Sequence, residues 1–192
     1  NGGDALRFAV MSLGITEGDE VVTVANTFTA TVDVIVQAEA TPVLVDCDEY
    51  FNIDVSQIEN KITKKTKAII PVHLYGQAAN MDEIMRIAKK YNIFVIEDAA
   101  QSIGAKYHGK FAGTIGDCGI FSFNQSKHIN TGEGGILITN DDYIAKIARA
   151  IRNHGEVADP ELGIVGFNYR MCEIEACLAI EQFKWIDDSI NW

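Results

Sequence analysis

Six short runs of apolar, β-branched residues recur along the sequence and alternate with stretches of helical periodicity. The runs that we expect to be buried strands span residues 20–24, 42–46, 68–72, 93–98, 119–123 and 135–139. Apolar residues at three- and four-residue spacing predict helices over residues 4–14, 80–91, 141–152 and 172–186. This alternation predicts an α/β fold in which a mostly parallel sheet is sandwiched by helices.

The stretch GAKYHGKFAGTIGDCG, residues 104–119, interrupts the alternation. Its glycines predict a hairpin or a loop that lies over the sheet. Asn80 is the expected cap of the helix 80–91, and Gly14 the expected stop of the helix 4–14. With 47% hydrophobic residues, the 192-residue chain can bury the core of one large domain. The sequence begins NGGDALRF and ends in an amphipathic helix, so we expect a piece of a longer protein.

The composition argues against several classes of function. Sixteen Lys and Arg against 27 Asp and Glu give a net charge of −11, which repels nucleic-acid backbones and anionic lipid. No apolar run is long enough to span a membrane, and no GxSxG pattern indicates a hydrolase. The histidines lack metal-ligand spacing, so no metal site is expected. The four scattered cysteines are expected to be reduced thiols of a cytoplasmic protein.

Ligands of such sheets bind beyond the carboxyl ends of the strands, so residues that follow the predicted strands are the first candidates for a site. Asp98 ends one strand, Lys127 lies shortly after another, and Phe28 follows a third. Gly2 and Gly3 precede the first helix, where backbone N–H groups and the helix dipole favour an anion. Each feature alone has an ordinary alternative: a helix cap, a solvated lysine, a core aromatic or a turn.

Together these four features match one ligand, pyridoxal 5′-phosphate (PLP). This molecule combines a phosphate, a flat aromatic ring, a basic ring nitrogen and an aldehyde. A lysine amine bonds the aldehyde, and an aspartate pairs with the ring nitrogen and keeps it protonated. The four features are therefore compatible with PLP, with Lys127 and Asp98 as its two reactive partners, but their spacing alone does not establish it.

Ordered motifs over nearly the whole chain resemble the DegT/DnrJ-type sugar-nucleotide aminotransferases. The motifs are NGGDAL, GDEVVTVANTFTAT, KAIIPVHLYGQAANMDEI, VIEDAAQSIGAKYHGKFAGTIGDCGIFSFNQSKHINTGEGG, RNHG and GFNYRMCEIEAC. The resemblance implies the aspartate-aminotransferase-like fold, PLP fold type I. It also implies that residues 1–192 are the PLP-binding large domain, incomplete at both ends and without the C-terminal small domain.

By this resemblance, Lys127 is the Schiff-base lysine and Asp98 the partner of the ring nitrogen, and both are catalytic. Gln101 matches the residue that hydrogen-bonds the phenolic oxygen of the cofactor, and Phe28 matches the aromatic that stacks on its ring. Besides Gly2, the positions that match the phosphate site are Gly3, Asp4 and Ser122. Where the family often has SGT, this chain has NGG, so a hydroxyl contact is missing at Gly3 and backbone donors take its place.

Asn168 matches an asparagine that reaches the phosphate of the neighbouring subunit, which implies a homodimer with shared active sites. The implied reaction moves an amino group from glutamate to a nucleotide-linked keto-deoxysugar, with Lys127 as the proton shuttle. Such reactions supply amino sugars for cell-surface polysaccharides or glycosylated metabolites.

Two alternative functions stay open. One is a noncatalytic protein that binds a sugar nucleotide or regulates a partner. The other is a PLP-dependent sugar dehydratase, because some relatives replace the lysine by histidine and His128 stands beside Lys127. Roles for His73, Tyr75 and Glu133 also stay open between substrate contact and loop packing.

Overall fold

The computed structural model describes residues 1–156 and 163–190, and its centre is a six-stranded sheet with the order β2-β1-β3-β4-β7-β8. All neighbouring strands are parallel except β7 and β8, which are antiparallel. The strands are β1 (Glu20–Val24), β2 (Thr41–Val45), β3 (Thr66–Ile70), β4 (Phe94–Asp98), β7 (Cys118–Ser122) and β8 (Gly135–Thr139). The mostly parallel sheet expected from the sequence is confirmed.

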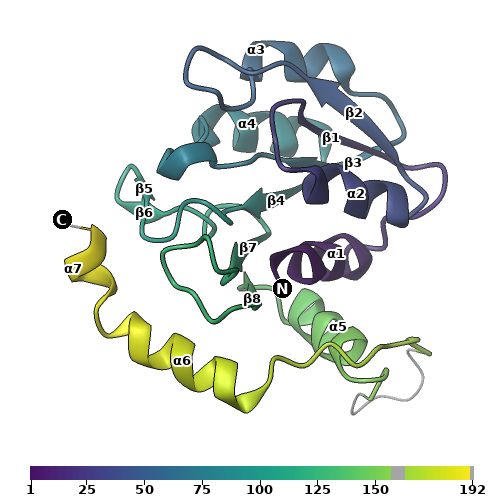
Figure 1. The fold of residues 1–192 in the computed structure, drawn as a ribbon. Coiled ribbons are helices and arrows are strands. Elements are labelled where there is room, and N and C mark those ends of the chain that lie inside the picture. Colours follow the sequence, from purple (N-terminus) through teal and green to yellow (C-terminus); the bar gives the residue numbers. More distant parts are fainter. Residues whose placement is uncertain (157–162, 191–192) are drawn as a thin grey trace.

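Helices cover both faces of this sheet, with α3 and α4 on one side and α1 and α5 on the other (Figure 1). The α-helices are α1 (Gly2–Ser12), α2 (Thr29–Gln37), α3 (Val55–Ile58), α4 (Met81–Tyr91), α5 (Asp142–Arg152), α6 (Glu173–Phe183) and α7 (Ile186–Ile190). Two single 3₁₀ turns are η1 (Glu59–Lys61) and η2 (Leu74–Gly76). Among the described residues, no helix has both the length and the apolar character that a membrane span requires.

Alternate residues of the central strands point into two separate cores, because successive side chains of a strand face opposite sides of the sheet. Ile96 of β4 packs in the core that α1 and α2 cover. Its neighbour Val95 packs in the core that α4 covers, together with Ile84. The same alternation continues to the end of β4, where it sends two adjacent carboxylates to opposite faces.

The predicted strands agree with the observed ones to within two residues at each end. The predicted helix 172–186 corresponds to α6, which ends at Phe183, and the short helix α7 that follows was not predicted. Helix α2 was not predicted. Its sequence TATVDVIVQ is rich in β-branched residues, and its N-cap Phe28 offers no side-chain hydrogen bond. Burial of Val34 and Ile35 against the sheet overrides this weak local preference.

The glycine-rich stretch 104–119 contains the predicted hairpin, formed by β5 (Lys106–Tyr107) and β6 (Lys110–Phe111). After the hairpin the backbone turns tightly against β7. A Cβ at Gly119 would lie 2.1 Å from the carbonyl oxygen of Gly113, so only glycine permits this contact. The expected helix signals also hold: Asn80 Oδ1 accepts a hydrogen bond from the Glu83 N–H at 3.3 Å.

Candidate active site

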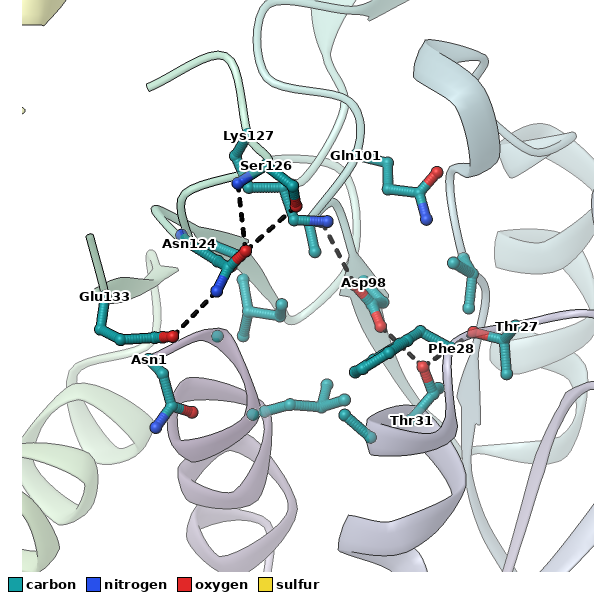
Figure 2. Close-up of a pocket in the computed structure, with 18 residues that line it drawn as sticks. Asn1, Thr27, Phe28, Thr31, Asp98, Gln101, Asn124, Ser126, Lys127 and Glu133 are labelled. Carbon is teal, nitrogen blue, oxygen red and sulfur yellow. Dashed lines mark hydrogen bonds between the residues drawn. The ribbon is translucent and has the colours of Figure 1, made fainter. Parts of the chain in front are cut away.

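A cavity of about 650 Å³ lies where β1, β3, β4 and β7 end, between the N-terminus of α1 and the loop that follows β7. Ligand sites of parallel sheets are expected at this edge. Figure 2 shows side chains from these distant segments around the cavity. Of the nine residues expected to form the site, the cavity is lined by Gly2, Gly3, Phe28, Asp98, Gln101, Ser122 and Lys127.

Asp98, the last residue of β4, holds a buried carboxylate that is 7% exposed. One oxygen accepts a hydrogen bond from Thr31 Oγ1 at 2.8 Å, and the other accepts from the Ala100 N–H at 3.2 Å. Burial raises the pKa of Asp98, and the hydrogen bonds from Thr31 and Ala100 offset this only in part. A cationic donor bound to this carboxylate would favour its charged form.

Lys127 stands at the tip of a compact loop between the antiparallel strands β7 and β8. The Lys127 N–H donates to the Asn124 carbonyl at 2.8 Å and closes a turn. Asn124 also accepts from Ser126 and donates to Glu133 Oε1 at 2.8 Å (Figure 2). These bonds position the loop, so that Lys127 borders the same cavity as Asp98.

The N-terminus of α1 approaches the sheet very closely. A Cβ at Gly2 would lie 2.7 Å from the Ser122 Cβ, and a Cβ at Gly135 would lie 2.4 Å from the Asn1 carbonyl oxygen. The first N–H groups of a helix have no acceptor within the helix. The Asn1 side chain satisfies that of Asp4. Gly2, Gly3 and Ser122 all line the cavity, and a helix start beside a hydroxyl is suited to a phosphate.

Phe28 and Gln101 are two further lining residues of the cavity. Phe28 is 72% exposed although it is a large aromatic residue, and it lies between the end of β1 and the start of α2. Gln101 is oriented by a hydrogen bond from the Tyr75 N–H to its Oε1 at 3.2 Å. The Tyr75 ring itself is exposed and contacts Phe51 edge-on.

The two remaining expected residues, Asp4 and Asn168, line a neighbouring cavity of about 730 Å³ instead. This second cavity lies along β8, between α1 and α5. Glu133 borders both cavities. Within this single chain, the structure therefore separates Asn168 from the residues around Lys127.

The open questions about the two histidines have different geometric answers. His73 is fully buried and bonds Glu97 at 2.8 Å, so it lies away from both cavities. His128 is exposed and borders neither cavity. Across residues 1–156 and 163–190, no group of three or more His, Cys, Asp or Glu side chains is arranged to hold a metal ion.

Sequence reasoning missed the two hydroxyls that support Asp98. The hydroxyls of Thr27 and Thr31 form a hydrogen bond of 2.9 Å, and the Thr31 hydroxyl donates a second one to the Asp98 carboxylate. Their hydroxyls on either side of the helix N-cap Phe28 were an available signal, because Ser and Thr there often form local side-chain hydrogen bonds. It was hidden by the failure to predict α2.

The cavity fits the PLP expected from the sequence. The unpaired N–H groups at the start of α1 and the Ser122 hydroxyl suit its phosphate. The buried Asp98 carboxylate suits a protonated ring nitrogen, and the exposed Phe28 suits a flat ring. Lys127 supplies a primary amine on the same cavity.

The chain is similar to curated proteins of known name. It is 46% identical to GDP-perosamine synthase of Caulobacter vibrioides, over 99% of this chain and 52% of that protein. It is 48% identical to a pleiotropic regulatory protein of Geobacillus stearothermophilus, over 97% of this chain and 51% of that protein. The chain thus spans about half the length of these relatives.

Solved structures share the fold. The aminotransferase from Psychrobacter cryohalolentis matches with a TM-score of 0.93 at 40% identity, over 98% of this chain and 51% of that chain. A GDP-4-keto-6-deoxymannose-3-dehydratase with a trapped PLP-glutamate geminal diamine matches with a TM-score of 0.89 at 32% identity, over 97% and 55% of the two chains. These matches confirm the PLP-aminotransferase fold. The family model of the DegT/DnrJ/EryC1/StrS aminotransferases covers residues 1–191, and the chain belongs to that family.

Proposed function

We propose that this chain is the PLP-binding large domain of a sugar-nucleotide aminotransferase. The enzyme transfers an amino group from glutamate to a nucleotide-linked keto-deoxysugar. The observation that carries the proposal is the convergence of Lys127, Asp98 and the glycine-led start of α1 on one cavity. The names of the relatives support a sugar nucleotide as the substrate class.

When bound, PLP supplies an electron sink for cleavage of a C–H bond at the carbon that bears nitrogen. Lys127 is proposed to bind the cofactor aldehyde and, once released, to carry the proton to and from that carbon at its Nζ. Asp98 would accept a hydrogen bond from the ring nitrogen of bound PLP and keep its proton in place. Gln101 would donate to the phenolic oxygen, and Phe28 would pack against the ring and exclude water.

The proposal extends to the assembly of the whole protein. We infer a cytoplasmic homodimer in which Asn168 of each subunit reaches the cofactor phosphate of its partner. The separation of Asn168 from the Lys127 cavity within one chain supports an intersubunit role. We also propose that residues 1–192 form only the large domain. The chain spans about half the length of its relatives, and the other half of their length is enough for a small domain.

Two other functions have a specific relative in their favour. A regulatory role has the Geobacillus stearothermophilus protein, and a dehydratase role has the structure with the trapped PLP-glutamate adduct. Lys127 borders the cavity and His128 does not, which favours the aminotransferase over a dehydratase that uses histidine. A purely regulatory protein has no need of the buried Asp98.

The direct test is borohydride reduction of the purified protein, at its full natural length, with added PLP. Peptide mapping is expected to find the reduced cofactor on Lys127. Lys127→Ala is expected to lose this adduct and about 10²- to 10⁴-fold in turnover of keto sugar nucleotides with glutamate.

Lys64→Ala, a change at an exposed lysine distant in sequence, is the matched control and is expected to keep both properties. An adduct that persists in Lys127→Ala would remove the proposed role of this residue. A trapped adduct without transamination of any keto sugar nucleotide would favour the regulatory alternative.

A further inference from the structure

Beside the cavity, on the opposite face of β4, lies a buried pair that the proposed chemistry does not use. Glu97 and His73 have no exposed side-chain surface, and His73 Nε2 lies 2.8 Å from Glu97 Oε2. The same oxygen accepts a hydrogen bond from the Gly113 N–H at 2.8 Å. The other oxygen accepts from the N–H groups of Ile115 and Gly116, both at 2.6 Å. The carboxylate therefore receives four donors.

The tautomer of His73 follows from its second nitrogen. His73 Nδ1 lies 3.1 Å from the Ala79 N–H, which has only a proton to give. Nδ1 is therefore the acceptor, and Nε2 carries the proton that is donated to Glu97. Through these bonds the pair fastens two loops, residues 73–79 and residues 112–117, to the end of β4.

Two residues at the start of the fastened segment 73–79 are tied to residues of the candidate active site. The His73 N–H donates to the carbonyl of Asp98 at 3.0 Å. The Tyr75 N–H donates to Gln101 Oε1 at 3.2 Å. The second loop also reaches the site, because a Cβ at Gly113 would lie 3.2 Å from the Cβ of Ala99, the residue after Asp98.

We propose that Glu97 and His73 are positioning residues, which hold Asp98 and Gln101 in place through the segment 73–79. The inference rests on the proposed function. Neither residue lines the Lys127 cavity, so neither touches a ligand there. A buried polar pair is also a poor source of stability, since apolar residues of similar volume often stabilise a fold equally well. The four hydrogen bonds to Glu97 fix the orientation of the groups that they join, and apolar packing does not.

The test is Glu97→Gln in the full-length enzyme with PLP. A glutamine amide turns its two N–H donors toward backbone N–H groups, so at least one of the four bonds is lost. We expect kcat to fall about 10- to 100-fold, as for a small misplacement of reacting groups. KM for the keto sugar nucleotide is expected to change little. In the PLP-free protein, amide hydrogen exchange is expected to accelerate at Tyr75, Ala79, Gly113, Ile115 and Gly116.

Four further variants separate positioning from stability. Glu17→Gln makes the same chemical change at an exposed site and is expected to have no effect. Ile84→Ala opens a cavity in the core below Glu97, and is expected to lower the unfolding temperature while kcat at moderate temperature stays unchanged. His73→Gln retains a donor for Glu97, and is expected to keep more turnover than His73→Leu.

Two results would overturn the inference: wild-type kcat in Glu97→Gln, or unchanged amide exchange in its PLP-free form. A wild-type protein that binds no PLP would instead refute the proposed function, and the positioning role would fall with it. Amide exchange needs no cofactor, so it distinguishes a wrong network from a wrong function.

Discussion

Glu97 and Asp98 are adjacent carboxylates at the end of one strand, and they face opposite sides of the sheet. Glu97 receives four hydrogen-bond donors, one of them from His73. Asp98 is also buried, but the structure gives it two, from Thr31 and Ala100. The first carboxylate has its acceptor capacity filled by its own chain, and the second keeps capacity for a ligand.

The pKa values of the two groups shift in opposite directions, because the balance between burial and hydrogen bonding differs at the two carboxylates. Burial acts to raise the pKa of Glu97, but the hydrogen bonds from His73, Gly116 and Gly113 outweigh it and the pKa is lowered. Burial prevails at Asp98, and its pKa is raised. A buried carboxylate whose donors are incomplete is thus a better guide to a ligand site than burial alone.

The largest expected effect comes from removing the charge at Asp98. Asp98→Asn is expected to lower turnover about 10²- to 10³-fold, because the ring nitrogen loses its charged partner. The PLP-free variant is expected to be at least as stable as the wild type, since a desolvated charge disappears. Steady-state kinetics and thermal unfolding measure the two effects. Asp33→Asn, at an exposed position of α2, is the control. Near-normal turnover in Asp98→Asn would contradict the view that the Asp98 carboxylate serves a ligand and the Glu97 carboxylate does not.

A smaller effect is expected from Thr31, whose hydroxyl supplies one of the two donors to Asp98. Thr31→Val keeps the shape but removes this bond, with an expected cost of about 1 kcal/mol in transition-state stabilisation, roughly fivefold in kcat/KM. Thr31→Ser keeps the hydroxyl and is expected to stay near the wild-type value. Equal kinetics for the two variants would mean that Thr31 serves packing alone.

The smallest expected effect is a difference in pH dependence. The lowered pKa of Glu97 stabilises the fold above the ordinary value of 4.5, and this stability is lost as the pH falls through the folded value. The raised pKa of Asp98 acts in the opposite sense: its contribution is full below 3.8 and is lost as the pH rises through the folded value.

Urea unfolding of the PLP-free protein across this range measures both trends. The stability gap between wild type and Glu97→Gln is expected to shrink with acid. The advantage of Asp98→Asn over wild type is expected to grow as the pH rises from 3.8. Parallel pH profiles for the two variants would contradict the contrast between the carboxylates.

Much of the fold was predictable because buried strands and amphipathic helices leave strong periodic patterns. The meeting of Asp98 and Lys127 followed from the same patterns, since the carboxyl ends of parallel strands share one edge. Helix α2 was not predictable in this way, because its β-branched residues favour a strand and only tertiary packing makes it helical.

The direction of a single side chain was the harder problem. His73 and Asp98 both occur at strand ends, yet one points into the core and the other into the cavity. The orientation of His73 depends on Glu97, 24 residues away, and that of Asp98 on Thr31, 67 residues away. Local patterns carry no information on such distant partners.

The close contact between the start of α1 and the sheet restricts how such a site diversifies during evolution. Because Gly2, which lines the cavity, has no room for a side chain beside Ser122, substitution there destroys this wall of the cavity rather than adjusting it. New substrate preferences have to arise at lining residues without an assigned cofactor contact, such as Ser126 and Glu133. A library aimed at a different sugar is best placed at those two positions, with Gly2 left untouched.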